Sequence, residues 1–157
     1  FAMNIFSSIV NDLNYVGVMA IEFFYGDTGL LINEIAPRTH NSAHFSIEAC
    51  SSSQFDQHIC ISSGIKTPEI KMHSKGSLMI NLLGLGKRYP LSIEKRIELL
   101  SQIKGSNIHW YGKSRESLGR KMAHITFLLN EDNHFERVKE SQEILTKVRD
   151  IWPSPND

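Results

Sequence analysis

The chain has 157 residues, of which 41% are hydrophobic and 22% are charged, the ordinary proportions of a globular protein. Seventeen basic side chains balance seventeen acidic ones, so no overall field favours nucleic acid or a membrane surface as a partner. Two cysteines do not make a disulfide framework and no apolar stretch reaches 18 residues, so we expect a reduced, cytoplasmic protein with no membrane contact.

The chain begins inside a helical pattern, without an initiator methionine. Ile5, Ile9 and Leu13 recur at helical spacing, with asparagine and serine between them. The sequence therefore predicts an opening helix, and its abrupt start leads us to expect a piece of a longer protein.

Two strand-like runs follow the opening helix. Residues 15–24 are almost continuously apolar and β-rich, which predicts a strand buried on both faces. Residues 26–29 have turn chemistry, and 30–36 form a second strand that Pro37 ends.

The rest of the chain mixes helices and strands without a strict strand–helix–strand alternation. The predicted helices cover one or two segments of 46–63, then 90–103 and 135–148, and the predicted strands cover 77–84, 106–112 and 120–129. The polar stretch 65–76 is the best candidate for a domain boundary. This order predicts an α+β fold with antiparallel sheets.

A pair of carboxylates stands out in the first two strands. If the turn is centred on Thr28, residues whose numbers add to 56 face each other, which places Glu22 opposite Glu34 with Cβ atoms roughly 5 Å apart. A register error of one residue would separate them. Two like charges side by side need a positive partner, and a hard cation such as Mg²⁺ suits carboxylates with the neighbouring Asn33 amide. Equally, one glutamate could face solvent while the other pairs with Arg38.

Two histidines lie four residues apart in the polar run N-E-I-A-P-R-T-H-N-S-A-H, residues 33–44. With Cys50 they raise the question of zinc, but their spacing fits no complete structural zinc pattern, and we expect no zinc site.

Several spaced motifs resemble one family in the same order along nearly the whole chain. They are V-G-V-M-A-I-E-F-F, N-E-I-A-P-R-T-H-N-S-A-H and S-Q-F-D-Q-H, then S-L-M-I-N-L-L-G, I-H-W-Y-G-K and G-R-K-M-A-H. The chain resembles the carboxyl-terminal portion of the N5-carboxyaminoimidazole ribonucleotide synthases, which are ATP-grasp enzymes of purine biosynthesis and the ATPase subunits of phosphoribosylaminoimidazole carboxylase. The resemblance implies that residues 1–66 end an ATP-grasp domain and that 70–157 form a small mixed α/β closing domain.

The resemblance also implies a reaction. ATP, with Mg²⁺, would phosphorylate bicarbonate to carboxyphosphate, and the amine of aminoimidazole ribonucleotide would capture the carboxyl group. Glu22 and Glu34 would be the Mg²⁺ ligands, and Asn33 and Glu34 would bind the nucleotide. The family's amino-terminal domain and the lobe that grips adenine are missing from these 157 residues, so we expect them to be inactive alone. The family is typically homodimeric, which we also expect here.

The resemblance places the other substrates on two further stretches. Arg38, His40 and Asn41 fall where the family holds bicarbonate and the imidazole, and a guanidinium suits a planar anion. Lys113 and Arg120 fall where it binds the ribose 5′-phosphate, within a basic, glycine-containing loop.

The chain departs from the family pattern at a few positions. Thr39 replaces the usual proline, Ala43 replaces a glycine, and Leu118 stands within a family Arg-Pro-Gly-Arg. Lost glycines could alter a close backbone approach to a ligand. Two other functions stay open, a non-catalytic binding or dimerisation module and a formate-using ATP-grasp transformylase of the same pathway.

Overall fold

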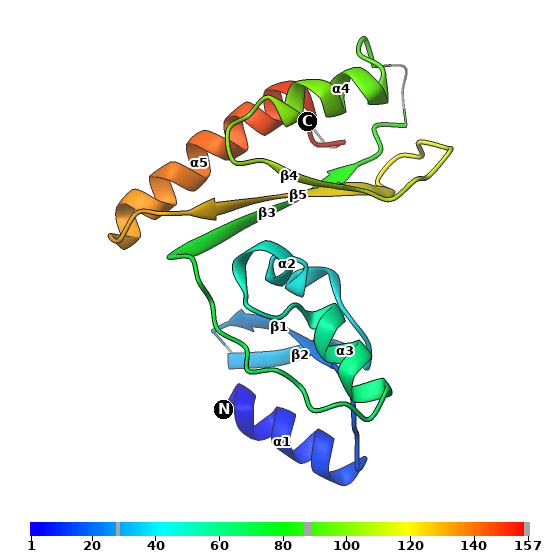
Figure 1. Ribbon diagram of the computed structural model, residues 1–157, viewed down its shortest axis with the longest axis vertical. Coiled ribbons are helices and arrows are strands. Elements are labelled where there is room, and N and C mark those ends of the chain that lie inside the picture. Colours follow the sequence, from blue (N-terminus) through cyan, green and yellow to red (C-terminus); the bar gives the residue numbers. More distant parts are fainter. Residues whose placement is uncertain (28, 87–88, 156–157) are drawn as a thin grey trace. The chain divides into compact units, whose positions relative to one another are not determined.

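In the computed structural model the described residues, 1–27, 29–86 and 89–155, belong to two compact units (Figure 1). Unit 1 is Phe1–Lys71 and unit 2 is Met72–Asp157. The division falls inside the polar stretch 65–76, whereas the assignment of 1–66 and 70–157 to two domains stays a prediction.

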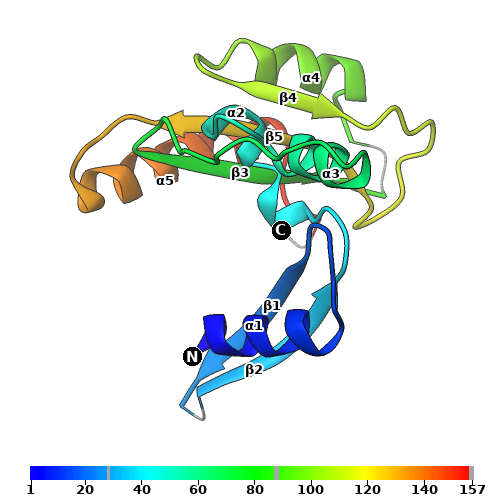
Figure 2. The same cartoon turned by 60° about the horizontal axis from the view of Figure 1, so that its bottom comes forward.

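Unit 1 combines one hairpin with short helices. Its elements are α1 (Ala2–Asp12), β1 (Ala20–Gly26), β2 (Gly29–Ala36), the 3₁₀ helix η1 (Asn41–Ala43), α2 (Ser46–Ala49) and α3 (Gln54–Ser62). Figure 2 shows α1 lying across the hairpin of β1 and β2. The predicted opening helix, the second strand and the two helical segments before Gly64 are confirmed.

The prediction of a strand over 15–24, buried on both faces, is wrong. Strand β1 begins only at Ala20, because Asn14 adopts a left-handed conformation and the Tyr15 hydroxyl donates to Val18 O over 2.9 Å, which folds the preceding segment into a loop. None of the residues of β1 is fully buried, and Tyr25 is 85% exposed. A continuous apolar run therefore does not by itself identify a buried strand.

The hairpin changes register part of the way along. At its tip Gly26 faces Gly29, and continuing this pairing would place Glu22 opposite Asn33. A β-bulge between Glu22 and Phe23 takes up one extra residue of β2, so Glu22 faces Glu34 instead. The predicted facing pair is confirmed, although a turn centred on Thr28 was the wrong premise, and Thr28 itself lies outside the described residues.

Unit 2 is an antiparallel three-stranded sheet with two helices. Its elements are β3 (Gly76–Leu83), α4 (Ile93–Ser101), β4 (Asn107–Trp110), β5 (Lys121–Leu129) and α5 (His134–Ile151), and the strand order is β3-β5-β4. Figure 1 shows α4 and α5 on the same face of this sheet. The predicted strands and helices of this half are confirmed, with shorter bounds for α4 and β4, and with them the α+β class with antiparallel sheets.

The main hydrophobic core lies in unit 2. The central strand β5 contributes Met122, Ile125 and Phe127, and α5 and the segment after it contribute Val148 and Trp152. Among the described residues of unit 1, only Ala36 and Ala49 are buried apolar side chains. No helix in the described part of the chain is both long enough and apolar enough to cross a lipid bilayer.

Candidate active site

The candidate site is the end of the hairpin where β1 and β2 bring two carboxylates together. Glu22 and Glu34 face each other across the strands, and Asn33 Nδ2 donates to Glu22 Oε2 over 3.2 Å. Both glutamate side chains are partly exposed, 40% for Glu22 and 47% for Glu34. The bulge explains why Asn33 joins them, because the extra residue of a bulge disturbs the strict alternation of side chains between two faces.

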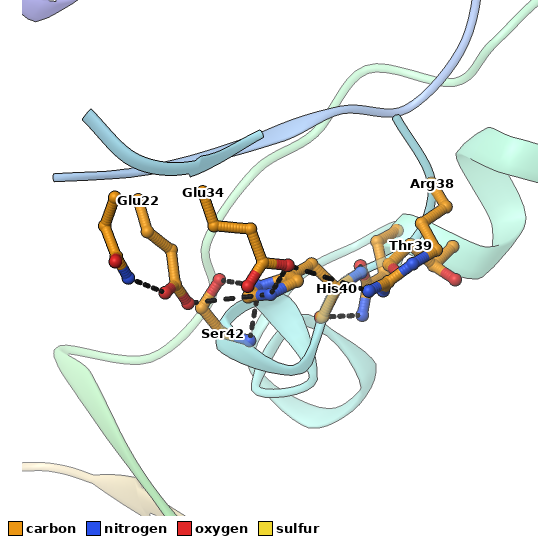
Figure 3. Close-up of polar contacts among 8 residues, drawn as sticks. Glu22, Glu34, Arg38, Thr39, His40 and Ser42 are labelled. Atoms are coloured by element: carbon orange, nitrogen blue, oxygen red, sulfur yellow. Dashed lines mark hydrogen bonds and ion pairs between the residues drawn. The ribbon is translucent and has the colours of Figure 1, made fainter. Parts of the chain in front are cut away.

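His40 contacts both carboxylates with one ring nitrogen (Figure 3). Its Nε2 atom lies 3.5 Å from Glu22 Oε1 and 3.6 Å from Glu34 Oε1. The histidine side chain is only 10% exposed, whereas the two carboxylates that it contacts are both partly exposed.

The other ring nitrogen determines the tautomer of His40. The backbone N–H of Ser42 donates to His40 Nδ1 over 3.3 Å, and the Ser42 hydroxyl lies 2.8 Å from the same atom. An Nδ1 atom that accepts from a backbone N–H carries no proton of its own, so the neutral ring has its proton on Nε2. The Nε2 atom faces the two glutamates at 3.5 and 3.6 Å, which is longer than an ordinary hydrogen bond.

The local sequence places His40 after a sharp exit from β2. The strand ends at Ala36, and Arg38 N donates to Ala36 O over 2.8 Å, which closes a turn around Pro37. His40 then caps η1 with its own side chain, in an extended conformation. Strand, proline turn and cap bring the histidine back alongside the glutamates.

Gln54 fixes the backbone of His40 and was not singled out from the sequence. Its Oε1 accepts from His40 N over 2.7 Å, and its Nε2 donates to His40 O over 2.8 Å. The same Nε2 lies 2.8 Å from His44 Nδ1. Gln54 is buried, and Ser53 caps α3 beside it in a reciprocal capping box with Asp56. The sequence signals were its place in the motif S-Q-F-D-Q-H and at the start of a helix that follows a serine.

Arg38 lies at the exposed edge of the site. Its Nη2 atom is 3.7 Å from Glu34 Oε1, and Nη1 donates to Thr39 O over 2.9 Å. The expected alternative of an Arg38–Glu34 pair therefore occurs together with the facing carboxylates, and such an exposed pair contributes little to stability. Asn41, the third residue expected to meet substrate, is half-buried at the start of η1.

The carboxylate pair fits a magnesium ion that takes its remaining ligands from elsewhere. Among the described residues, no group of three or more histidine, cysteine, aspartate and glutamate side chains is arranged to hold a metal ion. Mg²⁺ in proteins commonly relies on one or two carboxylates together with waters and substrate phosphates. Glu22 and Glu34 supply such a pair, and the donor set is all oxygen.

The two candidate phosphate ligands lie in unit 2, on the loop 111–120 between β4 and β5. The ammonium group of Lys113 donates to Lys121 O and lies 5.3 Å from the centroid of the Tyr111 ring. Arg120 Nη1 donates to Arg115 O over 3.3 Å. Lys113 is thus tied to the main chain at the start of β5, and Arg120 to the main chain of the loop itself.

Two family models match the chain, one in each unit. The ATP-grasp domain matches residues 1–55, and the phosphoribosylaminoimidazole carboxylase C-terminal domain matches residues 77–138. The order of the two matches along the chain is the order that the sequence motifs predict.

The chain is similar to curated proteins called N5-carboxyaminoimidazole ribonucleotide synthase. The one from Synechococcus elongatus is 39% identical over 149 residues, which are 95% of this chain and 38% of that protein. The one from Staphylococcus saprophyticus is 36% identical and covers 87% of this chain and 35% of that protein. The chain thus spans less than two fifths of the length of these relatives.

Solved structures agree with the sequence comparison. A Staphylococcus aureus N5-carboxyaminoimidazole synthetase complexed with ADP matches 96% of this chain and 38% of its own, with 34% identity and a TM-score of 0.76. An Aspergillus clavatus enzyme in complex with ADP and 5-aminoimidazole ribonucleotide matches 84% of this chain and 35% of its own, with 31% identity and a TM-score of 0.68. The chain belongs to the N5-carboxyaminoimidazole ribonucleotide synthase family of ATP-grasp proteins and corresponds to their carboxyl-terminal portion.

Proposed function

We propose that this chain carries part of the active site of an ATP-dependent carbon–nitrogen ligase. The reaction is the carboxylation of 5-aminoimidazole ribonucleotide by bicarbonate in purine biosynthesis. The observation that carries the proposal is the facing pair Glu22 and Glu34, with His40 Nε2 within 3.6 Å of both carboxylates. The printed names of the relatives and their bound ADP and aminoimidazole ribonucleotide support it.

Glu22 and Glu34 form the nucleotide end of the proposed site. They would hold Mg²⁺, which when bound neutralises charge on the transferring phosphoryl group of ATP. Asn33 orients Glu22 through its amide hydrogen bond and, with Glu34, lies on the strand beside the nucleotide. His40 lies beside both carboxylates, with Nε2 3.5 Å from Glu22 Oε1 and 3.6 Å from Glu34 Oε1.

Arg38, His40 and Asn41 form the acceptor end. A phosphoryl group passes from ATP to a bicarbonate oxygen, which yields ADP and carboxyphosphate. The exocyclic amine of the imidazole then attacks the carboxyl carbon, phosphate leaves, and the nitrogen loses a proton. The exposed Arg38 guanidinium can turn toward the anion, and the chain contributes mainly by holding the reactants together.

Lys113 and Arg120 complete the proposal by binding the ribose 5′-phosphate. Lys113 also donates to Lys121 O at the start of β5, and Arg120 donates to Arg115 O within the loop, which limits the directions in which the two cations point. A lysine and an arginine on one short loop suit a phosphate group, because both side chains donate charge-assisted hydrogen bonds.

The remaining expectations belong to the same proposal. Residues 1–66 would end an ATP-grasp domain and 70–157 would be the closing domain, which agrees with the two family matches. We place the protein in the cytoplasm as a homodimer, and both described cysteines, Cys50 and Cys60, are free thiols. The 157 residues by themselves are expected not to turn over ATP, because the named relatives are more than twice as long.

A chimera tests the proposal. The matching segment of the Synechococcus elongatus relative is replaced by these 157 residues, and ADP release is measured with aminoimidazole ribonucleotide and bicarbonate. Glu34→Ala is expected to lower the rate by about 100-fold, because it removes one of two charges that organise the phosphoryl transfer. Glu69→Ala is the control, since Glu69 is an exposed carboxylate of the same unit that pairs with Lys71. Unchanged ADP release by the Glu34 variant would refute the metal-ligand role.

Two further results separate the alternatives. A chimera that uses formate in place of bicarbonate would indicate the transformylase. A well-folded chimera without substrate-dependent ADP release would indicate a binding or dimerisation module.

A further inference from the structure

The loop 111–120 has three cations and a single acid as its charged residues. It contains Lys113, Arg115 and Arg120, and its one carboxylate belongs to Glu116. The acid lies between the cations in sequence, where it could compete with an anionic ligand for them. Its actual partner lies elsewhere, in the core of unit 2.

That partner is Arg96, on the inner face of α4. Arg96 is 1% exposed, and its Nη1 and Nη2 atoms donate to Glu116 Oε1 over 3.1 Å and to Oε2 over 2.8 Å. Its guanidinium carbon lies 4.0 Å from the centroid of the Trp152 ring, and Trp152 Nε1 in turn donates to Leu83 O over 2.7 Å. The guanidinium is therefore fixed by packing as well as by the ion pair.

A buried ion pair is a poor device for stability alone. Desolvating two charges offsets most of their attraction, and an apolar pair of similar volume often serves as well or better. Arg96 Nε, moreover, has no hydrogen-bond partner in the described part of the chain. What the pair adds is a fixed orientation of the Glu116 side chain, because the planar guanidinium donates two parallel hydrogen bonds to a carboxylate in only one orientation.

The same loop is fastened to the turn that follows β3. Glu116 Oε1 also accepts from Leu85 N over 3.0 Å. Gly84 N donates to Arg120 O over 2.7 Å, and Gly119 N donates to Gly84 O over 2.8 Å. A Cβ atom on Gly84 would lie 2.1 Å from Ser117 O, so the loop crosses the glycine at a distance that no side chain permits.

We infer that Arg96 and Glu116 are positioning residues for phosphate binding by the loop 111–120. Arg96 neutralises the only acid of the loop and holds it against the core. Lys113, Arg115 and Arg120 are then left as the charges that the loop presents to a phosphate group. The inference rests on the proposed function for the identity of the phosphate ester, a ribose 5′-phosphate.

Binding of ribose 5-phosphate to the 157-residue chain tests the inference. Glu116→Gln is expected to weaken binding about tenfold, because the loop loses its charge-assisted anchor while Gln preserves the shape. This variant also leaves Arg96 buried without its charged partner, so the denaturant midpoint of unfolding of the variant should fall. The double variant Arg96→Met with Glu116→Gln removes both charges and should recover the midpoint while binding stays weak.

Glu98→Gln is the matched control. Glu98 lies on the same helix as Arg96 but is exposed and pairs with Lys95 over 2.7 Å, so its replacement should leave binding unchanged. Recovery of both the unfolding midpoint and the binding in the double variant would overturn the inference. The weaker binding of Glu116→Gln would then be due to its lower stability alone. Failure of the unsubstituted chain to bind ribose 5-phosphate would also overturn the inference.

In the chimera, the inference predicts a change in one Michaelis constant. Glu116→Gln and the double variant should raise KM for aminoimidazole ribonucleotide about tenfold and leave KM for ATP within about twofold. An equal rise in both constants would contradict a positioning role. An inactive unsubstituted chimera would refute the proposed function, whereas a Glu116-dependent affinity for ribose 5-phosphate in the chain would still support the inference, so the two can fail separately.

Discussion

At the residue scale, the candidate site depends on one histidine and on what holds it. The facing glutamates could be predicted from the sequence, because charged residues in an apolar run are a local signal, whereas His40 was singled out for this site only by the resemblance of its motif to the family. Gln54 could not, since its role comes from two hydrogen bonds to a backbone 14 residues away. A carboxamide is well suited to this place because it donates and accepts at once.

Replacing Gln54 by glutamate tests this role in the chimera. Glutamate can still accept from His40 N but cannot donate to His40 O or to His44, and it adds a charge. We expect the rate of ADP release to fall about tenfold, as is usual when the outer support of a site is removed.

Gln57→Glu is the matched control for this change. Gln57 is a buried amide of the same helix, and its Nε2 donates to Ser52 Oγ and Pro68 O rather than to His40. Equal losses of activity in the two variants would show that Gln54 only stabilises α3.

At the element scale, periodicity located most helices and strands but not their burial. Strand β5 and helix α5 were placed to within a few residues, because each has a strong local pattern and packs in a core. The prediction of a strand in the segment before β1 was wrong, since a left-handed Asn14 and one tyrosine hydrogen bond determine the path of this segment. From the sequence only the charges of the loop 111–120 could be recognised, because its anchorage depends on distant residues such as Gly84, which is 36 positions from Arg120.

The attachment of that loop to α4 predicts a pH dependence of stability. Burial alone would raise the pKa of Glu116, but the hydrogen bonds from Arg96 and from the Leu85 N–H outweigh it and hold the pKa below its ordinary value of 4.5. A carboxyl whose pKa is lower in the folded state stabilises the fold above the unfolded pKa and loses this effect as pH falls through the folded pKa. The contribution of Glu116 should therefore be complete at neutral pH and be lost as the pH falls from the ordinary pKa of 4.5 through the lower pKa of the folded state.

Denaturant unfolding of the chain and of Glu116→Gln measures this contribution. Both tryptophans, Trp110 and Trp152, lie in unit 2, so their fluorescence reports on the relevant core. At neutral pH the variant should be less stable by about 3 kcal/mol, the usual cost of breaking a buried pair. The difference should shrink as the solution is acidified, and a difference that does not vary with pH would rule out this origin.

At the scale of the whole chain, apolar burial is unequally divided. Unit 2 contains the packed cluster around β5, whereas unit 1 buries little and leaves Phe24 and Leu31 of its hairpin exposed. Composition could not reveal this division, because the apolar residues of both halves look alike in sequence. A two-stranded hairpin is at best marginally stable unless other elements cover it.

Hydrogen exchange of the chain should reflect this inequality. Amide protons of β5, the central strand of its sheet, should exchange slowest, and those shared by β1 and β2 at least about 100-fold faster. Mass spectrometry of peptides from the two units measures the two rates in one sample. Equal protection would mean that the units open together.

The bulge in the first hairpin makes the position of the carboxylate pair less dependent on the length of the hairpin tip. On the tip side of the bulge the strands follow one pairing, and on the open side they follow another. The loss of one residue at the tip could be absorbed by smoothing the bulge away, because a two-residue connection with regular pairing then leads to the same partners at Glu22 and Glu34. The length of the tip is thus decoupled from the placement of the acids, and related chains can vary there without giving up the pair.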